Sequence, residues 1–216
     1  MIVSRGRGYI FVHIPKTGGT ALMLALEARA MADDILVGDT PKARRRRGRL
    51  KGVKTRGRLW KHARLADVEG LVSRAEMAEL FIFTLVRNPW DRLVSYYHWL
   101  RGQRFEHEAV RLAQALDFAD FLRHPHTQAA FRAAPADSYM RDPDGAERAD
   151  LYIRLEHFSE DAAPLFAHLG FALELPRANV SERDRDWRGY YTNETAAIVA
   201  DICAPDIARF GYSFAP

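Results

Sequence analysis

The sequence predicts an α/β protein in which a central parallel sheet is flanked by helices in three layers. Short apolar runs typical of strands alternate along the chain with longer segments of helix-forming residues. Two of these runs end in polar turns from which a helix begins directly. The length of 216 residues and the 48% hydrophobic content suit one globular domain, which we expect to comprise residues 1–216.

Four apolar segments read as strands. Residues 9–14 and 80–86 are rich in aromatic and β-branched residues, and the second run, LFIFTLV, has the continuous apolar character of a central parallel strand. Residues 35–37 and 151–156 are the other two candidates. Their spacing leaves room for a helix between consecutive strands, as a parallel sheet requires.

Helix-forming segments fill most of the intervals between the strands. They cover residues 20–30, 65–80 in two pieces, 89–100, 106–116, 118–123, 159–169 and 194–208. Asn88 and Pro89 begin one helix as cap and first residue, Gly170 closes another, and Pro205 interrupts the last. We expect residues 124–150 to be turn-rich and residues 176–192 to be irregular.

Positive charge is concentrated in one part of the chain, the basic segment, which is defined here as residues 42–64. It holds twelve Lys or Arg and no acid, whereas the remainder has 20 basic and 28 acidic residues. Its glycines favour irregular structure, so we expect a basic loop at about residues 41–61. Such a run is commonly a solvated loop, but it also attracts polyanions: nucleic acid, acidic glycan or anionic lipid.

The remaining composition points to the cytoplasm. Cys203 is the only cysteine, so no disulfide can form within the chain. The first residues lack the apolar core of a signal peptide, and no run of about 18 apolar residues is present. We therefore expect a cytoplasmic protein with no integral membrane segment.

The loop HIPKTGGTAL, after the first strand, has the chemistry of an anion site. Gly18 and Gly19 let the backbone approach a ligand closely, Lys16 adds a full charge, and Thr17 and Thr20 add hydroxyl donors. The lysine precedes the glycines, so the Walker pattern of nucleotide triphosphatases is absent. The simpler alternative is a plain turn in which Thr20 caps the helix.

A second strand, turn and helix in TLVRNPWDRLVSYYHWL follow the same design. Arg87 ends the strand, and Ser95 lies eight residues later on the helix. A guanidinium and a hydroxyl can converge on one anion, although Arg87 and Asp91 can also form a structural ion pair with Ser95 on the helix surface. Two anion sites at the carboxyl ends of parallel strands indicate a ligand with two separate anionic groups.

These motifs together resemble those of sulfotransferases that use 3′-phosphoadenosine-5′-phosphosulfate (PAPS), especially heparan sulfate 2-O-sulfotransferase and small bacterial relatives. The resemblance covers nearly the whole chain. It extends over HIPKTGGTAL (13–22), KHARLADV (61–68), FTLVRNPWDRLVSYY (83–97), the turn at 142–145 with RLEHF, and YYTNETAAIVADICAPDIARFGY (190–212). It implies a P-loop-like fold and transfer of a sulfuryl group to a hydroxyl of an acceptor.

The resemblance also implies roles for particular residues. The 5′-phosphosulfate of PAPS would be bound by Lys16, Thr17, Gly18, Gly19 and Thr20. Arg87 and Ser95 would bind the 3′-phosphate. Residues 181–191 occur where such enzymes close over the nucleotide, and the candidates there are Arg183, Arg188 and Tyr190.

The reaction needs a base for the acceptor hydroxyl and a group that stabilises the leaving phosphate. Lys16 would stabilise the bridging oxygen as its bond to sulfur breaks. His62 occupies the place where relatives of the 2-O-sulfotransferase type carry a catalytic histidine. His13 and His98 read as structural, whereas Glu76 and Glu27 stay alternatives, because related enzymes use a glutamate as base. No metal is required, and the product is adenosine 3′,5′-bisphosphate.

Several functions remain open at this point. The acceptor is expected to be a carbohydrate that is recruited by the basic segment, and a tryptophan could stack on its ring. The main alternative is a protein that binds nucleic acid or another polyanion through residues 42–64. A third possibility, an ATP-dependent kinase, is disfavoured by the missing Walker pattern. The fourth possibility is an inactive relative that only binds the nucleotide.

Overall fold

The computed structural model describes residues 1–176, 183–184 and 186–215. The chain divides into two compact units. The first unit comprises Met1–Val86 and Ala136–Asn179, and the second comprises Arg87–Pro135 and Val180–Pro216.

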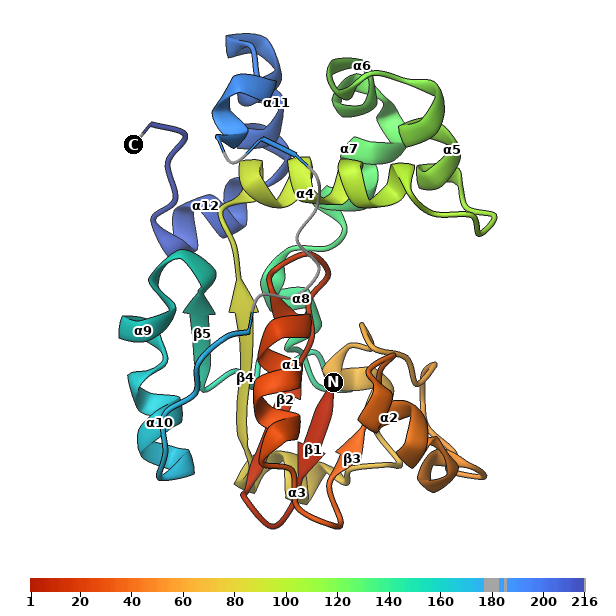
Figure 1. Cartoon of the computed structure of the whole chain (residues 1–216), viewed down its shortest axis with the longest axis vertical. Helices are drawn as coiled ribbons and strands as arrows, with labels where there is room; N and C mark the ends of the chain where they lie inside the picture. Colours follow the sequence, from red (N-terminus) through yellow and green to blue (C-terminus); the bar gives the residue numbers. More distant parts are fainter. Residues whose placement is uncertain (177–182, 185, 216) are drawn as a thin grey trace. The chain divides into compact units, whose positions relative to one another are not determined.

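The first unit contains a five-stranded sheet in the order β3-β1-β2-β4-β5. The strands are β1 (Ile2–Ser4), β2 (Tyr9–Val12), β3 (Ile35–Leu36), β4 (Phe81–Val86) and β5 (Leu151–Arg154). β2, β4 and β5 are mutually parallel, and only β1 runs antiparallel to its neighbours β2 and β3. This mostly parallel sheet, flanked by helices, confirms the expected α/β class (Figure 1). The expected strands are present, and β1 is an additional one.

Helix α1 (Gly19–Ala28) packs on the sheet through its apolar side chains (Figure 1). Leu22 and Leu26 of α1 share one core with Phe11 of β2 and Phe83 and Leu85 of β4. The other helices of this unit are α2 (Pro41–Arg46), α3 (Arg74–Glu79), α8 (Ala136–Tyr139), α9 (Phe158–Asp161) and α10 (Ala163–Leu169). Gly170 ends α10 in the left-handed conformation, as its position in the sequence predicts.

The beginning of the expected basic loop is helical, so the prediction of a loop over 41–61 was wrong in this part. Thr40 caps α2 by accepting a hydrogen bond from the amide of Ala43, and Pro41 occupies the first turn. A 3₁₀ turn, Arg47–Leu50, follows directly. The cap and the proline outweigh the glycines, which lie outside α2 at 48, 52 and 57.

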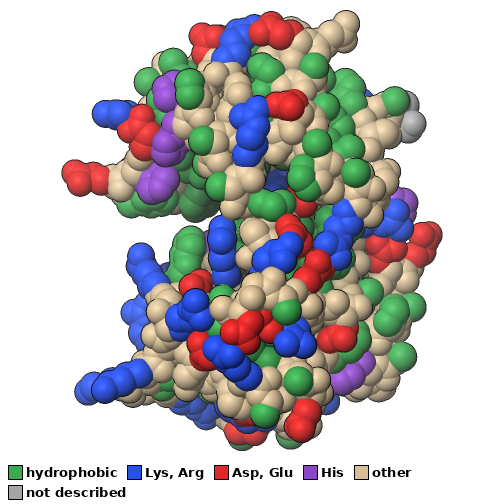
Figure 2. Space-filling model, turned by 180° about the vertical axis from the view of Figure 1, so that it is seen from behind, with side chains coloured by type: hydrophobic (Ala, Val, Ile, Leu, Met, Phe, Trp, Pro, Cys, Tyr) green, Lys and Arg blue, Asp and Glu red, His purple; other side chains and the backbone are tan. Residues whose placement is uncertain are grey.

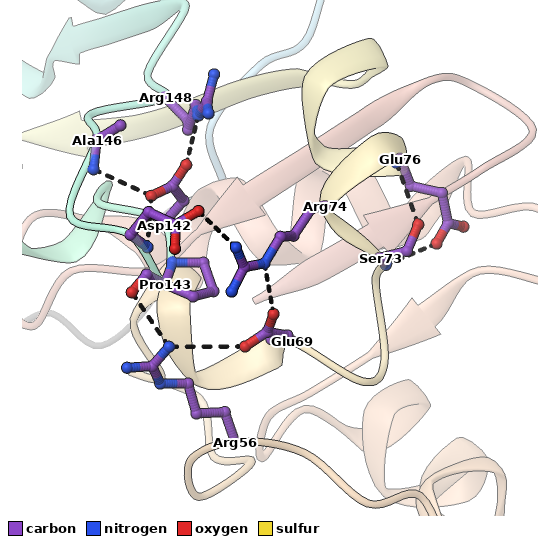
Figure 3. A network of polar contacts seen from close by, with 10 residues as sticks. Arg56, Glu69, Ser73, Arg74, Glu76, Asp142, Pro143, Ala146 and Arg148 are labelled. Atoms are coloured by element: carbon purple, nitrogen blue, oxygen red, sulfur yellow. Dashed lines mark hydrogen bonds and ion pairs between the residues drawn. The ribbon is translucent and has the colours of Figure 1, made fainter.

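The second half of the basic segment is attached to the rest of the first unit by a polar network (Figure 3). The Arg56 guanidinium donates to the backbone oxygen of Pro143 at 3.1 Å and lies 3.6 Å from the Glu69 carboxylate. Arg74 bridges Glu69 and Asp144 at 2.7 and 2.6 Å. These contacts tie residues around 56 to the turn at 142–145, so this part of the basic segment has a defined place in the unit.

The second unit is helical. It contains α4 (Pro89–Arg101), α5 (Glu108–Ala115), α6 (Phe118–Arg123), α7 (Pro125–Arg132), α11 (Asn193–Ile202) and α12 (Ala204–Phe210). The Asn88 side chain caps α4 by accepting from the amide of Trp90, as predicted. Helices α7 and α8 occupy the first part of the segment expected to be turn-rich at 124–150, whereas the expected turn at 142–145 is present. Helix α7 begins with a His124 cap and Pro125. Among the described helices, none is both long and apolar enough to cross a membrane.

Candidate active site

The loop that follows β2, residues 13–19, is called the glycine loop and has an unusual backbone at its lysine. Lys16 has φ +66°, and no other described residue except glycine has a positive φ. The Thr17 hydroxyl is buried and donates to the backbone oxygen of Ile14 at 2.9 Å, which closes the turn. A left-handed conformation costs an L-residue roughly 1–2 kcal/mol. The structure maintains this strain at the one residue of the loop that carries a full positive charge.

The two glycines of this loop are required by close packing. Gly18 is the N-cap of α1 with φ +86°, so the alternative in which Thr20 is the cap was wrong. A Cβ on Gly18 would lie 2.7 Å from Leu155, and a Cβ on Gly19 would lie 2.1 Å from the His13 ring. The first amide groups of a helix have no partner within the helix and carry partial positive charge. The N-terminus of α1 therefore has the local geometry of an anion site.

His62 lies against the same part of the first unit. Its Nδ1 is 2.8 Å from the backbone oxygen of His13, and the centroids of the two imidazole rings are 4.6 Å apart. A carbonyl oxygen only accepts, so Nδ1 of His62 carries the proton of this bond. In the neutral ring, Nε2 is then the nitrogen with the lone pair. His13 thus links His62 to the glycine loop, because its ring also packs against Gly19.

Both histidines are held neutral near pH 7. Burial lowers the pKa of His62 to about 4, and the hydrogen bond to the His13 carbonyl opposes this shift. Burial, followed by the charge of His62, lowers the pKa of His13 well below its usual value. A neutral His62 is able to accept a proton through Nε2.

The glutamates that were kept as alternative bases are engaged elsewhere. Glu76 pairs with Arg5 at 2.7 Å and caps α3, and the Arg5 bond lowers its pKa to about 2. Arg5 belongs to the hairpin before β2, whereas the glycine loop follows the other end of that strand. Glu27 accepts from the Thr40 hydroxyl at 2.6 Å and lies about 12 Å along α1 from Gly19, at 1.5 Å per residue. Neither carboxylate is placed beside the loop.

In the second unit, Arg87 is part of a cluster of two arginines and one carboxylate. Its Nε and Nη2 donate to one oxygen of Asp91 at 2.8 and 2.6 Å, and Arg183 donates to the other oxygen at 2.6 Å. All three side chains are 15% exposed or less. The Arg87–Asp91 ion pair was the structural alternative, and it is present. Arg183 thus shares the half-buried carboxylate of Asp91 with Arg87, so two guanidinium groups lie close together.

Ser95 lies one turn beyond Asp91 on α4 and is buried, so it is not the surface residue of the structural alternative. Residues four apart share a helix face, which places Ser95 on the face of Asp91. The ring of His98 packs edge-on against Tyr190 at 5.2 Å, consistent with a structural role.

Arg188 and Tyr190 are the other candidates within residues 181–191, and both bond to residues of the same unit. The Arg188 guanidinium donates to the backbone oxygen of Phe214 at 3.0 Å and lies 4.4 Å over the Trp187 ring. The Tyr190 hydroxyl accepts from the amide of Asp184. Sequence reasoning missed the Asp91–Arg183 contact, because 92 positions separate these residues and no local pattern links them. The rest of the expected segment 181–191 falls at 181–182 and 185, outside the described residues.

The described residues contain no group of three or more His, Cys, Asp or Glu side chains that could hold a metal ion. The site residues offer cationic groups, hydroxyls, backbone amides and one neutral imidazole. This set suits binding of phosphate or sulfate groups and acceptance of one proton.

Comparison with known proteins agrees with this chemistry. The family model described as the sulfotransferase family matches residues 1–213. Among solved structures, the chain is similar to mouse sulfotransferase SULT7A1 complexed with PAP, with 16% identity over 94% of this chain and 85% of that chain and a TM-score of 0.49. It is also similar to a sulfotransferase from Alicyclobacillus acidocaldarius, with 17% identity over 98% of each chain and a TM-score of 0.39.

No curated protein matches the chain. Structural similarities as weak as these two add nothing about the activity. The assignment of the chain to a family therefore depends on the family match alone. It spans nearly the whole sequence, including the glycine loop, His62 and the Arg87 cluster. The chain belongs to the sulfotransferase family.

Proposed function

We propose that this sulfotransferase moves a sulfuryl group from PAPS to a hydroxyl of a carbohydrate acceptor. The observation that carries the proposal is the loop after β2, where a strained lysine and two close-packed glycines precede the N-terminus of α1. A loop of this kind binds an anion through backbone amides and one full charge. The family membership makes a sulfate donor the expected anion.

The two charged ends of the nucleotide are assigned to separate groups of residues. The 5′-phosphosulfate is bound by Lys16 and the loop residues Thr17, Gly18, Gly19 and Thr20. The 3′-phosphate is bound by Arg87 and Ser95. In support, Arg87 and Arg183 bring two guanidinium groups together at Asp91, and Ser95 is buried on the same helix face as Asp91. Arg recognises phosphate through a planar set of donors, which favours Arg87 for this role.

The proposed reaction is an in-line displacement at sulfur. The acceptor oxygen forms a bond to sulfur while the bond from sulfur to the 5′-phosphate oxygen breaks, and the bond electrons leave with adenosine 3′,5′-bisphosphate. His62 takes the hydroxyl proton at Nε2, because Nδ1 is occupied by its bond to His13. Lys16 stabilises the negative charge that develops on the leaving phosphate. The imidazolium then returns its proton to water.

Three further features stay predictions. One catalytic domain comprising residues 1–216 is the expected organisation. A cytoplasmic location rests on the single cysteine, Cys203, which is buried. A polyanion-binding protein that uses the basic segment is the competing function, because most Lys and Arg side chains of that segment are exposed.

Calorimetry tests the proposal. We expect adenosine 3′,5′-bisphosphate to bind wild type more tightly than ATP does, without magnesium, and Lys16→Ala to weaken that binding. Lys51→Ala, at an exposed lysine of the basic segment, is the control and should bind as wild type does. Equal affinity for ATP, or binding that survives Lys16→Ala, contradicts the proposal. Single-stranded DNA that binds tightly with a steep salt dependence would favour the competing function.

A further inference from the structure

His98 of α4 has a buried ring nitrogen that no group of the described protein satisfies. Its Nε2 atom is shielded from solvent and has no hydrogen-bond partner. Other histidines differ: Figure 2 shows several at the molecular surface, and His107, His157 and His168 are exposed. Among the described histidines only His13 also has such an atom, and it lies at the glycine loop. A buried polar group without a partner is costly, so the Nε2 of His98 requires an explanation.

The position of His98 on its helix suggests one. Positions 91, 95 and 98 are spaced as i, i+4 and i+7, so Asp91, Ser95 and His98 form one stripe along α4. Ser95 is the residue to which the 3′-phosphate is assigned, and it is buried. Residues three positions apart on one helix face have Cβ atoms about 5–6 Å from each other. One phosphate group is large enough to contact both Ser95 and His98.

The part of the chain that carries Arg183 and Tyr190 lies against this stripe. Arg183 donates to Asp91 at 2.6 Å, and the Tyr190 ring packs edge-on against the His98 ring with centroids 5.2 Å apart. The Tyr190 hydroxyl accepts from the amide of Asp184 at 3.1 Å, which joins the two ends of this stretch. The orientation of the His98 ring is therefore fixed by packing, while its Nε2 is left for another group.

The protonation state of His98 suits the donation of one hydrogen bond. Burial, followed by the positive charge of Arg183, lowers the pKa of His98. The ring is therefore neutral at pH 7. A neutral imidazole has one N–H donor, and the oxygens of a phosphate group are strong acceptors. The nearby guanidinium of Arg183 attracts the same anion.

We propose that His98 is a third residue that binds the 3′-phosphate, and that it donates through Nε2 to one of the phosphate oxygens. This inference rests on the proposed function, in which Arg87 and Ser95 bind the same group. Arg87 supplies charge, Ser95 supplies a hydroxyl, and His98 supplies a donor whose direction is fixed before the nucleotide arrives. Such preorganisation reduces the entropic cost of binding. His98 thereby increases the preference for nucleotides that carry a 3′-phosphate.

A purely structural role for His98 leads to a different expectation. A ring that only packs against Tyr190 is replaced without loss by phenylalanine, which keeps an aromatic ring but has no nitrogen. A ring that donates through Nε2 is replaced better by glutamine, whose side-chain amide places an N–H donor at a similar distance from the backbone. Two variants at position 98 therefore separate packing from hydrogen bonding.

Calorimetry with adenosine 3′,5′-bisphosphate and adenosine 5′-phosphate is the test. We expect His98→Phe to weaken the binding of the bisphosphate about tenfold and to leave the monophosphate unchanged. His98→Gln should keep most of the affinity for the bisphosphate. His157→Phe, at an exposed histidine of the first unit, is the control and should bind both nucleotides as wild type does.

Nuclear magnetic resonance of the wild type provides a readout that needs no variant. Long-range correlation of ring protons with ring nitrogens distinguishes the two neutral forms of imidazole. In the complex with adenosine 3′,5′-bisphosphate, the proton of His98 should be on Nε2, and the resonance of this nitrogen should shift relative to the complex with adenosine 5′-phosphate.

Several outcomes overturn the inference. These are unchanged affinity of His98→Phe for the bisphosphate, equal losses for both nucleotides, weaker binding by His98→Gln than by His98→Phe, and a bisphosphate complex in which the Nε2 of His98 has no proton. Each of them leaves the proposed function intact as long as Lys16→Ala weakens the binding of the bisphosphate. If wild type binds the bisphosphate no more tightly than ATP, the proposed function fails and the role of His98 fails with it.

Discussion

The Nδ1 atom of His62 lies 2.8 Å from the backbone oxygen of His13, one residue before the glycine loop begins to turn. Because a side-chain substitution cannot remove a backbone oxygen, the tautomer of His62 is set by the fold itself. The same residue, His13, packs its ring against Gly19. The position of the base and the position of the helix N-terminus are therefore fixed by one residue of the chain.

The lowered pKa of His62 predicts a stability that depends on pH. The unfolded chain binds a proton at His62 near pH 6.5, whereas the folded chain binds it near pH 4. Stability that is present above pH 6.5 is therefore lost as the pH falls toward 4. For a shift of this size, about 2 kcal/mol of the free energy of unfolding is lost between pH 7 and pH 5.

Urea unfolding of wild type and His62→Gln at pH 7 and pH 5 measures this effect. The variant should lose about 2 kcal/mol less than wild type between the two values. His157→Gln, at an exposed histidine, serves as the control and should follow wild type. Identical losses in wild type and His62→Gln would show that the His62 ring is not desolvated as the structure has it.

Lys16 is expected to reduce stability through its backbone and to support function through its charge. Lys16→Gly and Lys16→Ala both remove the ammonium group, but only glycine adopts φ +66° without steric cost. Lys16→Gly should therefore be more stable than Lys16→Ala by about 1 kcal/mol, measured by thermal unfolding. Both variants should lose affinity for adenosine 3′,5′-bisphosphate to the same extent. A less stable glycine variant would mean that the left-handed turn carries no strain.

Asp91 is expected to matter for stability because it separates two half-buried arginines. Asp91→Asn removes the charge of the carboxylate that Arg87 and Arg183 share, which should reduce the free energy of unfolding by about 1–3 kcal/mol. Asp201→Asn removes the carboxylate of an exposed pair with Arg132 and should cost at most about 0.5 kcal/mol. Denaturant unfolding of the two variants gives the comparison. Equal costs would show that the Asp91 cluster is no better shielded from water than a surface pair.

Features with a local signal could be predicted from the sequence. The apolar runs that became β2, β4 and β5, the Asn88 cap of α4 and the closing Gly170 all depend on residues within a few positions of one another. β1 was missed because three apolar residues at the start of the chain give too short a pattern to identify a strand. Helix α2 was missed because the density of charge and glycine concealed the cap at Thr40.

The details of the site needed the structure. The composition of the glycine loop indicated an anion site, but the left-handed backbone of Lys16 and the contact between Gly19 and His13 depend on packing. His62 was a candidate base by resemblance alone, and its tautomer follows from a bond to a residue 49 positions away. The contact of Arg183 with Asp91 also depends on tertiary packing. It joins residues that are 92 positions apart, and no local sequence pattern links them.

The central claim is that Lys16 and Arg87 bind opposite ends of one nucleotide, and calorimetry with two ligands tests it most directly. Adenosine 3′,5′-bisphosphate and adenosine 5′-phosphate differ only in the 3′-phosphate. Lys16→Ala should weaken the binding of both ligands. Arg87→Ala should weaken the bisphosphate about 10- to 100-fold and leave the monophosphate unchanged, with Arg101→Ala on the same helix as the control. An Arg87→Ala enzyme that binds both ligands as wild type does, or loses both equally, would contradict the account.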